Sequence, residues 1–245
     1  MAADRILLEV CVDTPAGLAA AIAGGADRIE LCAALGLQGL TPAPGLMALA
    51  ASAPIPVYPM IRPRTGDFCF DARDLDAMRR DIDAVRGYGL AGVTIGANRP
   101  DGELDLDVLD KLVEHSAGLG MTLHRSFDFV ADQPAALEAA IQLGFERVLT
   151  SGGALTALAG AERIAALVAQ ADGRISILAG AGVRASNVVE LVARTGVREV
   201  HGSFGDPIPG PDPVSRLVTM GFVPAEMRDT DQHAVAEVAR ILRDL

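Results

Sequence analysis

Two short apolar runs each place a glutamate two residues before a cysteine, EVC at 9–11 and ELC at 30–32. Hydrophobic residues alternate along both runs, which indicates β-strands whose glutamate and cysteine share one side. The apolar side should pack against helices, because an unpaired carboxylate between sheet and helix is costly. Inward-facing thiolates suit Cu(I), and inward-facing carboxylates suit acid–base catalysis. The side chains expected to face inward are Glu9, Cys11, Glu30 and Cys32.

Other polar side chains end predicted strands at inward-facing positions. The third strand contributes Arg62, the fifth contributes His124, and the eighth contributes His201 and Ser203. These groups should therefore converge on one end of the fold. A purely structural interpretation is also open, in which the two glutamates and Arg62 form an ion-pair cluster and the cysteines are small buried hydrophobic residues.

Three glycine-rich turns follow the sixth, seventh and eighth predicted strands. Glycine lets backbone N–H groups approach an anion closely, although turns between strands and helices also use glycine for steric reasons. The turn after the seventh predicted strand leads to a predicted helix start at Ser186-Asn187. The N-terminus of a helix favours negative charge. The sequence therefore predicts an anion site formed by Gly152, Gly153, Gly180, Gly182, Arg184, Gly202 and Ser203.

Short apolar runs alternate along the chain with longer stretches of helical periodicity. The predicted strands are 6–12, 28–33, 56–62, 92–96, 120–127, 147–152, 175–180 and 199–204. The predicted helices include 71–87, 105–117, 134–143, 157–170 and 186–194. Eight β-α units predict an α/β fold, a single (β/α)8 TIM-barrel domain over residues 1–245, with a doubly wound open sheet as the alternative. Such barrels bind ligands at the C-terminal ends of their strands, where the polar groups gather.

One long irregular segment, 205–230, separates the last predicted strand from the final helix. It contains apolar residues that a solvated loop does not need, among them Leu217, Met220 and Phe222. We expect a long loop that folds over the mouth of the barrel or enters a subunit contact in a homo-oligomer.

Composition argues against several classes of protein. The net charge of −11 would repel a phosphate backbone, so nucleic-acid binding is not expected. No apolar run reaches the roughly 20 residues that span a bilayer, and the start of the chain lacks the pattern of a secretory signal. The three cysteines do not suggest a disulfide framework, so we expect free thiols in a reducing cytoplasm.

Several stretches resemble the CutC family, in the same order along the chain. They are EVCVD (9–13), GGADRIELCAALGLQGLTP (24–42), MIRPRTGDFCF (60–70), TLHRSFD (122–128), RVLTSGG (147–153), AGAGVRASNV (179–188) and EVHGSF (199–204). The resemblance implies a cytoplasmic (β/α)8 barrel with a role in copper homeostasis, which binds Cu(I) through Cys11 and Cys32. The chain departs from the family pattern at Ala33-Ala34, at Thr65 and in the AGAG turn, and none of these changes removes a thiol, carboxylate or histidine.

The first expected function is therefore that of a copper homeostasis protein. Neighbouring strands run about 4.8 Å apart, so one Cu(I) ion could bridge Cys11 and Cys32 if the two thiols lie at matching heights. The chain has no Met-rich or His-rich tract, which argues against a high-capacity copper store.

The alternative is an enzyme of the lyase, isomerase or hydrolase type that acts on a small anionic or phosphorylated metabolite. Arg62 and the glycine turns would bind the anion. The two glutamates should lie close enough to repel one another, and a single arginine would not neutralise both. The candidate acid–base residues are Glu9, Glu30, His124 and His201.

Overall fold

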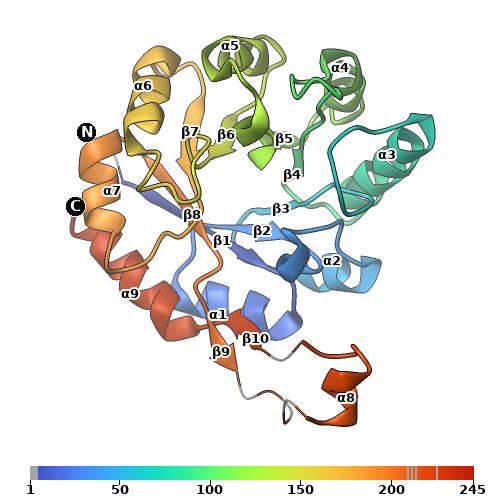
Figure 1. Cartoon of the computed structure of the whole chain (residues 1–245), viewed down its shortest axis with the longest axis vertical. Coiled ribbons are helices and arrows are strands. Elements are labelled where there is room, and N and C mark those ends of the chain that lie inside the picture. The colour runs from blue at the N-terminus through green and yellow to red at the C-terminus, as the bar shows by residue number, and fades with distance from the viewer. Residues whose placement is uncertain (1–4, 209, 211, 213, 225) are drawn as a thin grey trace.

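The structure of the protein is a computed structural model that describes residues 5–208, 210, 212, 214–224 and 226–245. Eight parallel strands pair in the order β3-β2-β1-β8-β7-β6-β5-β4 around a central lumen (Figure 1). They are β1 Leu7–Val12, β2 Arg28–Leu31, β3 Val57–Pro59, β4 Gly92–Ile95, β5 Gly120–Leu123, β6 Arg147–Thr150, β7 Ser176–Ala179 and β8 Glu199–Gly202. The ring closes between β3 and β4, where the Ile61 backbone N–H donates to the Thr94 carbonyl at 2.9 Å. The predicted barrel is confirmed, and the open sheet is wrong.

An outer ring of helices covers the strands (Figure 1). It consists of α1 Pro15–Gly24, α2 Pro44–Ala50, α3 Ala72–Gly87, α4 Leu106–His115, α5 Gln133–Gln142, α6 Ala161–Ala171, α7 Val188–Thr195 and α9 Gln232–Arg243. Polar side chains cap several of these helices, as Thr14, Asp71 and Asp132 do. The outward-facing strand residues, such as Val10 and Ile29, belong to the apolar core beneath them. No helix within the described ranges is long and apolar enough to cross a membrane.

Two strands end three or more residues earlier at the mouth than their sequence pattern suggests. The strand predicted at 120–127 ends at Leu123, and a short 3₁₀ helix, η2 Arg125–Phe129, follows it. The strand predicted at 56–62 is reduced to Val57–Pro59, and the Arg62 backbone N–H donates to the Thr41 hydroxyl at 3.0 Å. In both places local polar hydrogen bonds replace the strand ladder, so the chain turns into the loops that surround the lumen.

Neighbouring strands are staggered, as closure of a barrel requires. Glu9 on β1 lies beside Arg28 on β2, and Cys11 lies beside Glu30. Cys32 therefore comes two residues beyond the level of Cys11. The condition for one ion to bridge the two cysteines, that their thiols lie at matching heights, is therefore not met by this register, because alternation identifies the face of a side chain but not the offset between strands.

Near the N-terminal ends of the strands, ion pairs fill the lumen. Arg28 donates to both Glu9 and Glu199, and Arg147 Nε lies 3.4 Å from a Glu199 oxygen. The guanidinium carbons of Arg28 and Arg147 lie 5.6 and 4.8 Å from the ring centre of Tyr58. Barrel interiors are more often packed with branched aliphatic side chains. In this polar part of the lumen, below the mouth, Glu9 and Glu199 are each paired with an arginine.

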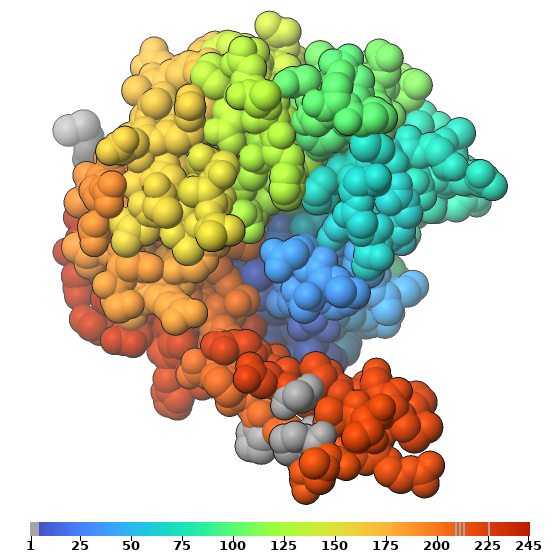
Figure 2. All heavy atoms as spheres, in the orientation of Figure 1, coloured from blue at the N-terminus to red at the C-terminus, as the bar shows by residue number. Residues whose placement is uncertain are grey.

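The described residues of the segment 205–230 form an arm that projects from the side of the barrel (Figure 1, Figure 2). Its base is an antiparallel ribbon of β9 Gly205–Ile208 and β10 Met227–Thr230, and its outer part contains the short helix α8 Arg216–Thr219. The Thr14 hydroxyl donates to the Asp229 carboxylate at 3.0 Å and ties the ribbon to the start of α1. The expected loop is thus a hairpin, and its described residues extend away from the mouth rather than over it.

Candidate functional site

A cavity of about 460 Å³, which we call the mouth cavity, opens at the C-terminal ends of the strands. It lies in the hollow at the centre of the molecule in Figure 2. This is the end at which (β/α)8 barrels bind ligands. Residues singled out from the sequence that line it include Cys11, Glu30, Arg62, His124, His201 and Ser203.

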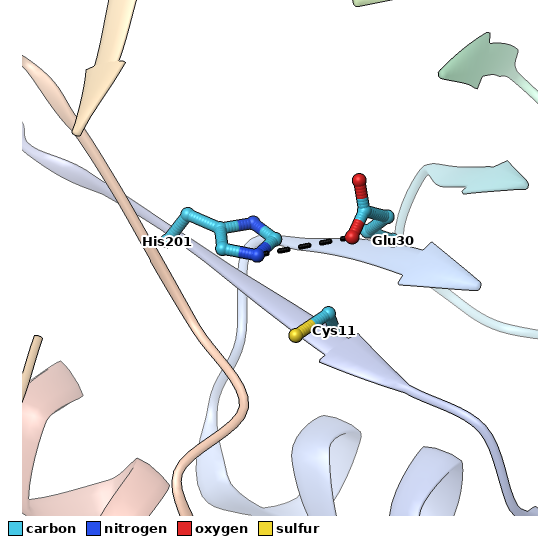
Figure 3. Close-up of side chains that lie close together, drawn as sticks. All are labelled: Cys11, Glu30 and His201. Carbon is cyan, nitrogen blue, oxygen red and sulfur yellow. Dashed lines mark ion pairs between the residues drawn. The ribbon is translucent and has the colours of Figure 1, made fainter. Parts of the chain in front are cut away.

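Three of these side chains meet on one wall of the mouth cavity (Figure 3). Cys11 from β1, Glu30 from β2 and His201 from β8 offer ligand atoms that all lie within 4.8 Å of one another. His201 Nε2 lies 3.8 Å from Glu30 Oε2, and all three side chains are buried. A thiol, an imidazole and a carboxylate that converge on a cavity could serve together as three protein ligands of a metal ion with one position left open.

Glu9 orients the His201 ring from below. His201 Nδ1 lies 2.8 Å from one Glu9 oxygen, and Arg28 Nε donates to the other. Burial would raise the pKa of Glu9, but Arg28 and His201 outweigh it and hold that pKa at about 2. Glu9 is therefore ionised at neutral pH and leaves Nε2 of His201 directed at Cys11 and Glu30. Because Glu9 does not line the mouth cavity, Glu30 is the glutamate that a ligand can reach.

Glu30 has the least compensated carboxyl group in the cluster. Burial raises its pKa to about 7 against the attraction of His201, and the charge of Glu9 adds to the rise. This repulsion between the two glutamates agrees with the expectation from sequence. Glu30 Oε1 has no hydrogen-bond partner among the described residues. The carboxyl group therefore has an unused oxygen beside the cavity.

Cys32 is fully buried next to this cluster and does not line the mouth cavity. Its Sγ lies 3.6 Å from Glu30 Oε2, and a Cβ on Gly39 would lie 3.1 Å from the same sulfur. Burial raises the pKa of the Cys32 thiol well above its ordinary value. Both cysteines thus lie near Glu30, but Cys11 alone of the two reaches the cavity.

Arg62 braces the loops around the mouth. Its terminal nitrogens donate at 2.8–3.1 Å to the carbonyls of Leu37, Gly39 and Gly66. Arg62 makes no ion pair with Glu9 or Glu30 in the described part of the chain, so the proposed cluster of these three residues is wrong. The physical reason is that β3 has already ended, and the guanidinium spans the loops rather than the lumen. The cation that neutralises Glu9 is Arg28.

His124 is a buried, neutral donor at the mouth. Its Nδ1 accepts a hydrogen bond from the Ser126 backbone N–H at 3.1 Å, so the neutral ring carries its proton on Nε2. Burial, with help from the charge of Arg62, lowers the pKa of His124 to about 3. Nε2 has no hydrogen-bond partner among the residues that the structure describes. His124 is therefore suited to donate a hydrogen bond to a ligand rather than to accept a proton at neutral pH.

The glycine turn after β6 does not form the expected anion site. The Gly153 N–H donates to the Asp128 carboxylate at 3.2 Å, and the Gly152 N–H donates to the Thr150 hydroxyl at 2.8 Å. Neither glycine lines a cavity described here. The protein's own carboxylate thus occupies the place that sequence analysis assigned to a ligand.

The remaining residues of the predicted anion site lie in and beside the turns after β7 and β8, and they have different roles. Gly180 has a packing role, because a Cβ there would lie 2.6 Å from Leu149 and 3.3 Å from His201. Gly182, Gly202 and Ser203 line both the mouth cavity and a second cavity beside it. Of these two cavities, Arg184 lines only the second.

Two further arginines, Arg28 and Arg125, belong to the site and are not among the residues predicted from the sequence. Arg28 shares the inward face of Glu30, so the same alternation could have identified it as the partner of Glu9. Arg125 lines the mouth cavity and donates from Nε to Asp128 at 2.8 Å. The sequence pattern predicts a strand over 120–127 that includes Arg125, whereas Arg125 begins the helix η2.

Comparisons with known proteins agree on one family. The CutC family model matches residues 6–206. A CutC family protein of Caulobacter vibrioides is 75% identical over 245 residues, which is 100% of both chains. One from Sinorhizobium medicae is 58% identical over 228 residues, 93% of this chain and 92% of the relative.

Solved structures give the same result. A crystal structure of CutC from Streptococcus agalactiae, a protein provisionally assigned to copper homeostasis, has a TM-score of 0.77 and 30% identity, and covers 81% of this chain and 98% of its own. A Rubisco-like protein from Rhodopseudomonas palustris, with a TM-score of 0.64 and 15% identity over 99% of this chain and 65% of its own, shares the fold alone.

Proposed function

This chain belongs to the CutC family, and we propose that it is a copper homeostasis protein that binds Cu(I) at the mouth of the barrel. The observation that supports this most strongly is the cluster of Cys11, Glu30 and His201, whose ligand atoms lie within 4.8 Å of one another on the cavity wall. The provisional assignment of the Streptococcus agalactiae relative to copper homeostasis supports the choice of metal.

Cys11 and His201 are the proposed primary ligands. Cu(I) is a soft cation that prefers thiolate and imidazole donors to carboxylates. Metal–ligand bonds of about 2.0–2.3 Å place ligand atoms roughly 3.5 Å apart, so side chains whose ligand atoms already lie within 4.8 Å of one another need only small movements to hold one ion. Glu30 then contributes negative charge or a weaker third contact. In the copper-free protein, burial raises the pKa of the Cys11 thiol against the influence of His201, so binding displaces a proton.

Glu9 supplies the support that metal-binding histidines require. Such histidines usually donate their other ring N–H to a carboxylate, which fixes the ring and its tautomer. Here Nδ1 of His201 faces Glu9 at 2.8 Å, and Glu9 is itself held by Arg28. This chain of contacts holds Nε2 toward Cys11 and Glu30, and because the pKa of His201 is raised well above its ordinary value, copper binding also displaces the proton from Nε2.

The family resemblance also implies Cys32 as a ligand, and its position favours a supporting role. Its thiol is buried behind the cluster, 3.6 Å from Glu30 Oε2, and away from the cavity. We therefore propose that Cys32 positions Glu30, while Cys11 binds the ion.

Competition with a Cu(I) chelator under anaerobic, reducing conditions tests this proposal. Cys11→Ser should weaken Cu(I) binding by at least about 100-fold. Loss of an outer hydrogen-bond partner of a metal ligand already costs up to about 100-fold in metal affinity, and Cys11 is proposed to contact the ion itself. Cys32→Ser should have a smaller effect, and Cys69→Ser is the matched control because Cys69 lies in the β3–α3 loop. Unchanged affinity in Cys11→Ser would refute the site. An equal loss in Cys32→Ser would show that both thiols bind the ion.

A second candidate function is an enzyme of the lyase, isomerase or hydrolase type acting on a small anionic metabolite. The mouth cavity, at about 460 Å³, is much larger than one ion needs, and it is lined by Arg62, His124 and Arg125. Arg62 Nε and His124 Nε2 have no hydrogen-bond partner in the described chain. Incubation with small phosphorylated and carboxylated metabolites, followed by NMR, tests for turnover. Consumption that His124→Gln abolishes would support the enzyme, and no consumption by the wild type would count against it.

A further inference from the structure

We propose that the second cavity binds the phosphate group of a small metabolite whose remainder extends into the mouth cavity. The two cavities share Gly182, Gly202 and Ser203, so a single molecule can contact both. The proposal does not depend on copper binding. It makes the second candidate function more specific by naming a phosphomonoester as the ligand class. The claim that one molecule extends from the second cavity into the mouth cavity rests on that second candidate function. We call the second cavity, of about 650 Å³, the phosphate cavity.

The phosphate cavity offers donors that are not used elsewhere. The Arg184 guanidinium makes no hydrogen bond or ion pair with any described residue. The backbone N–H groups of Gly182, Val183 and Ser203 likewise have no acceptor within the described chain. Unpaired N–H groups beside a cationic side chain are the chemistry that recognises an oxyanion.

The backbone of the turn after β7 has the form of an anion-binding concavity. Ala181 and Gly182 have successive positive φ angles of 84° and 72°. Gly182 is followed by Val183 at negative φ, and such a change of hand between neighbouring residues directs consecutive N–H groups to one side, as in the concavities known as nests. Ala181 adopts this conformation at an energetic cost, because a Cβ disfavours the left-handed region. The turn therefore presents its N–H groups between the two cavities, where Gly182 lines both.

Other charges limit where the phosphate can lie. Asp206 and Glu237 also line the phosphate cavity, and Arg228 donates to the Gly205 carbonyl at 2.7 and 3.2 Å. Two carboxylates repel a dianion, so the phosphate should lie against Arg184 and the turn after β7. This arrangement predicts opposite effects for two substitutions: loss of Arg184 weakens binding, and loss of the Glu237 charge strengthens it.

The mouth cavity explains why a metabolite, rather than inorganic phosphate, is the proposed ligand. Beyond the shared residues lie the unpaired His124 Nε2 and Arg62 Nε, whose side chains line that cavity. Hydroxyl or carbonyl oxygens attached to the phosphate can accept from such donors. A short phosphomonoester should therefore bind more tightly than phosphate alone.

The experiment measures binding of inorganic phosphate and of glycerol 3-phosphate to the metal-free, reduced protein by calorimetry, with potassium chloride at equal ionic strength as the reference. Both anions should bind saturably, and glycerol 3-phosphate more tightly. Arg184→Gln should weaken both by about tenfold or more, since a charge-assisted contact contributes about 1.5–3 kcal/mol. Glu237→Gln should strengthen both. Arg163→Gln, which changes an exposed arginine on α6, is the matched control.

Several outcomes would overturn the proposal. If the anions bind no more tightly than chloride, there is no specific phosphate site. If Arg184→Gln and Arg163→Gln change the affinity for the anions equally, the phosphate does not bind at Arg184. Equal affinity for the two anions would show that the ligand does not extend into the mouth cavity. Cys11→Ser separates this proposal from the copper site: it should weaken Cu(I) binding by at least about 100-fold, whereas inorganic phosphate, held in the phosphate cavity that Cys11 does not line, should still bind.

Discussion

His201 connects the acidic and thiol groups of the lumen. Its Nδ1 faces Glu9 at 2.8 Å, and its Nε2 lies with Cys11 and Glu30 on the cavity wall. Burial would lower the pKa of His201, but Cys11 and Glu30 raise it well above its ordinary value. The two glutamates therefore differ: Glu9 forms an ion pair with Arg28, whereas the ion-pair partner of Glu30 among the described residues is the imidazole, with the Cys32 thiol 3.6 Å away.

We predict that Glu30→Gln leaves the metal-free protein as stable as the wild type or stabilises it. Burial raises the folded-state pKa of Glu30 to about 7, so the folded protein loses stability as the pH rises from the unfolded value near 4.5 through 7. The free energy of unfolding of the variant should therefore exceed that of the wild type by on the order of 1–3 kcal/mol at pH 8 and by almost nothing at pH 5. Urea unfolding at both pH values measures this. A large loss at pH 8, with unchanged Cu(I) binding, would identify Glu30 as a structural ion-pair partner instead.

Glu9→Gln should have the opposite effect and destabilise the fold. Arg28 and His201 would each lose a charged partner, and breaking a buried pair costs roughly 3–5 kcal/mol. The folded-state pKa of Glu9 is about 2, so its contribution is present above pH 4.5 and is lost as the pH falls toward 2. Urea unfolding between pH 3 and pH 7 should show a shallower pH dependence in the variant. Glu114→Gln, on an exposed face of α4, is the control, and equal stability of Glu9→Gln and wild type at pH 7 would contradict the prediction.

At the scale of elements, the offset between strands decides which side chains meet. Because Cys11 lies beside Glu30 rather than Cys32, a thiol and a carboxylate share one level of the barrel. β8 brings His201 to the same wall, since it pairs with β1 at the level of Glu9. The turn after β7 then has to leave room for the imidazole, and Gly180 provides it.

We predict that Gly180→Ala weakens Cu(I) binding by displacing His201. The new Cβ would lie 3.3 Å from both Cβ and Cδ2 of His201 and 2.6 Å from Leu149 Cδ1. Overpacking of this kind costs roughly 1–3 kcal/mol of stability, and the ring should move away from Cys11. Gly45→Ala is the control, because no atom lies within 4 Å of a Cβ built there. Chelator competition on both variants measures the difference, and equal affinities would show that His201 does not depend on this turn.

Sequence reasoning identified the inward faces but not the levels of the barrel. Alternation alone placed Cys11, Glu30 and His201 in the lumen, because period two separates the faces of a strand whatever its neighbours do. It could not give the stagger that separates Cys11 from Cys32, which closure of the barrel sets. It also could not show that Asp128 satisfies the N–H groups of the turn after β6, since that contact joins residues 25 positions apart.

At the scale of the whole molecule, a barrel with a polar mouth carries an apolar arm. The outer part of the arm exposes large hydrophobic side chains, with exposed fractions of 79% for Val214 and 75% for Phe222. Apolar groups gathered on a projecting hairpin are typical of a protein–protein contact. The expected homo-oligomer therefore has a specific candidate interface in this arm.

We predict that the arm mediates self-association. Light scattering after gel filtration should give the wild type a mass that is a multiple of 25.4 kDa. Replacing both Leu217 and Phe222 with aspartate should reduce it to the single-chain mass. Leu155→Asp is the control, because Leu155 is 96% exposed on the barrel, away from the arm. A wild-type mass of one chain at tens of micromolar would contradict the prediction.

X-ray absorption at the copper edge of the Cu(I)-loaded protein tests the central claim most directly. We predict a first coordination sphere with one sulfur and at least one nitrogen or oxygen, which corresponds to Cys11 with His201. The sulfur should disappear in Cys11→Ser and remain in Cys32→Ser. A sphere of two sulfurs, or one without sulfur in the wild type, would contradict a copper site built from Cys11 and His201.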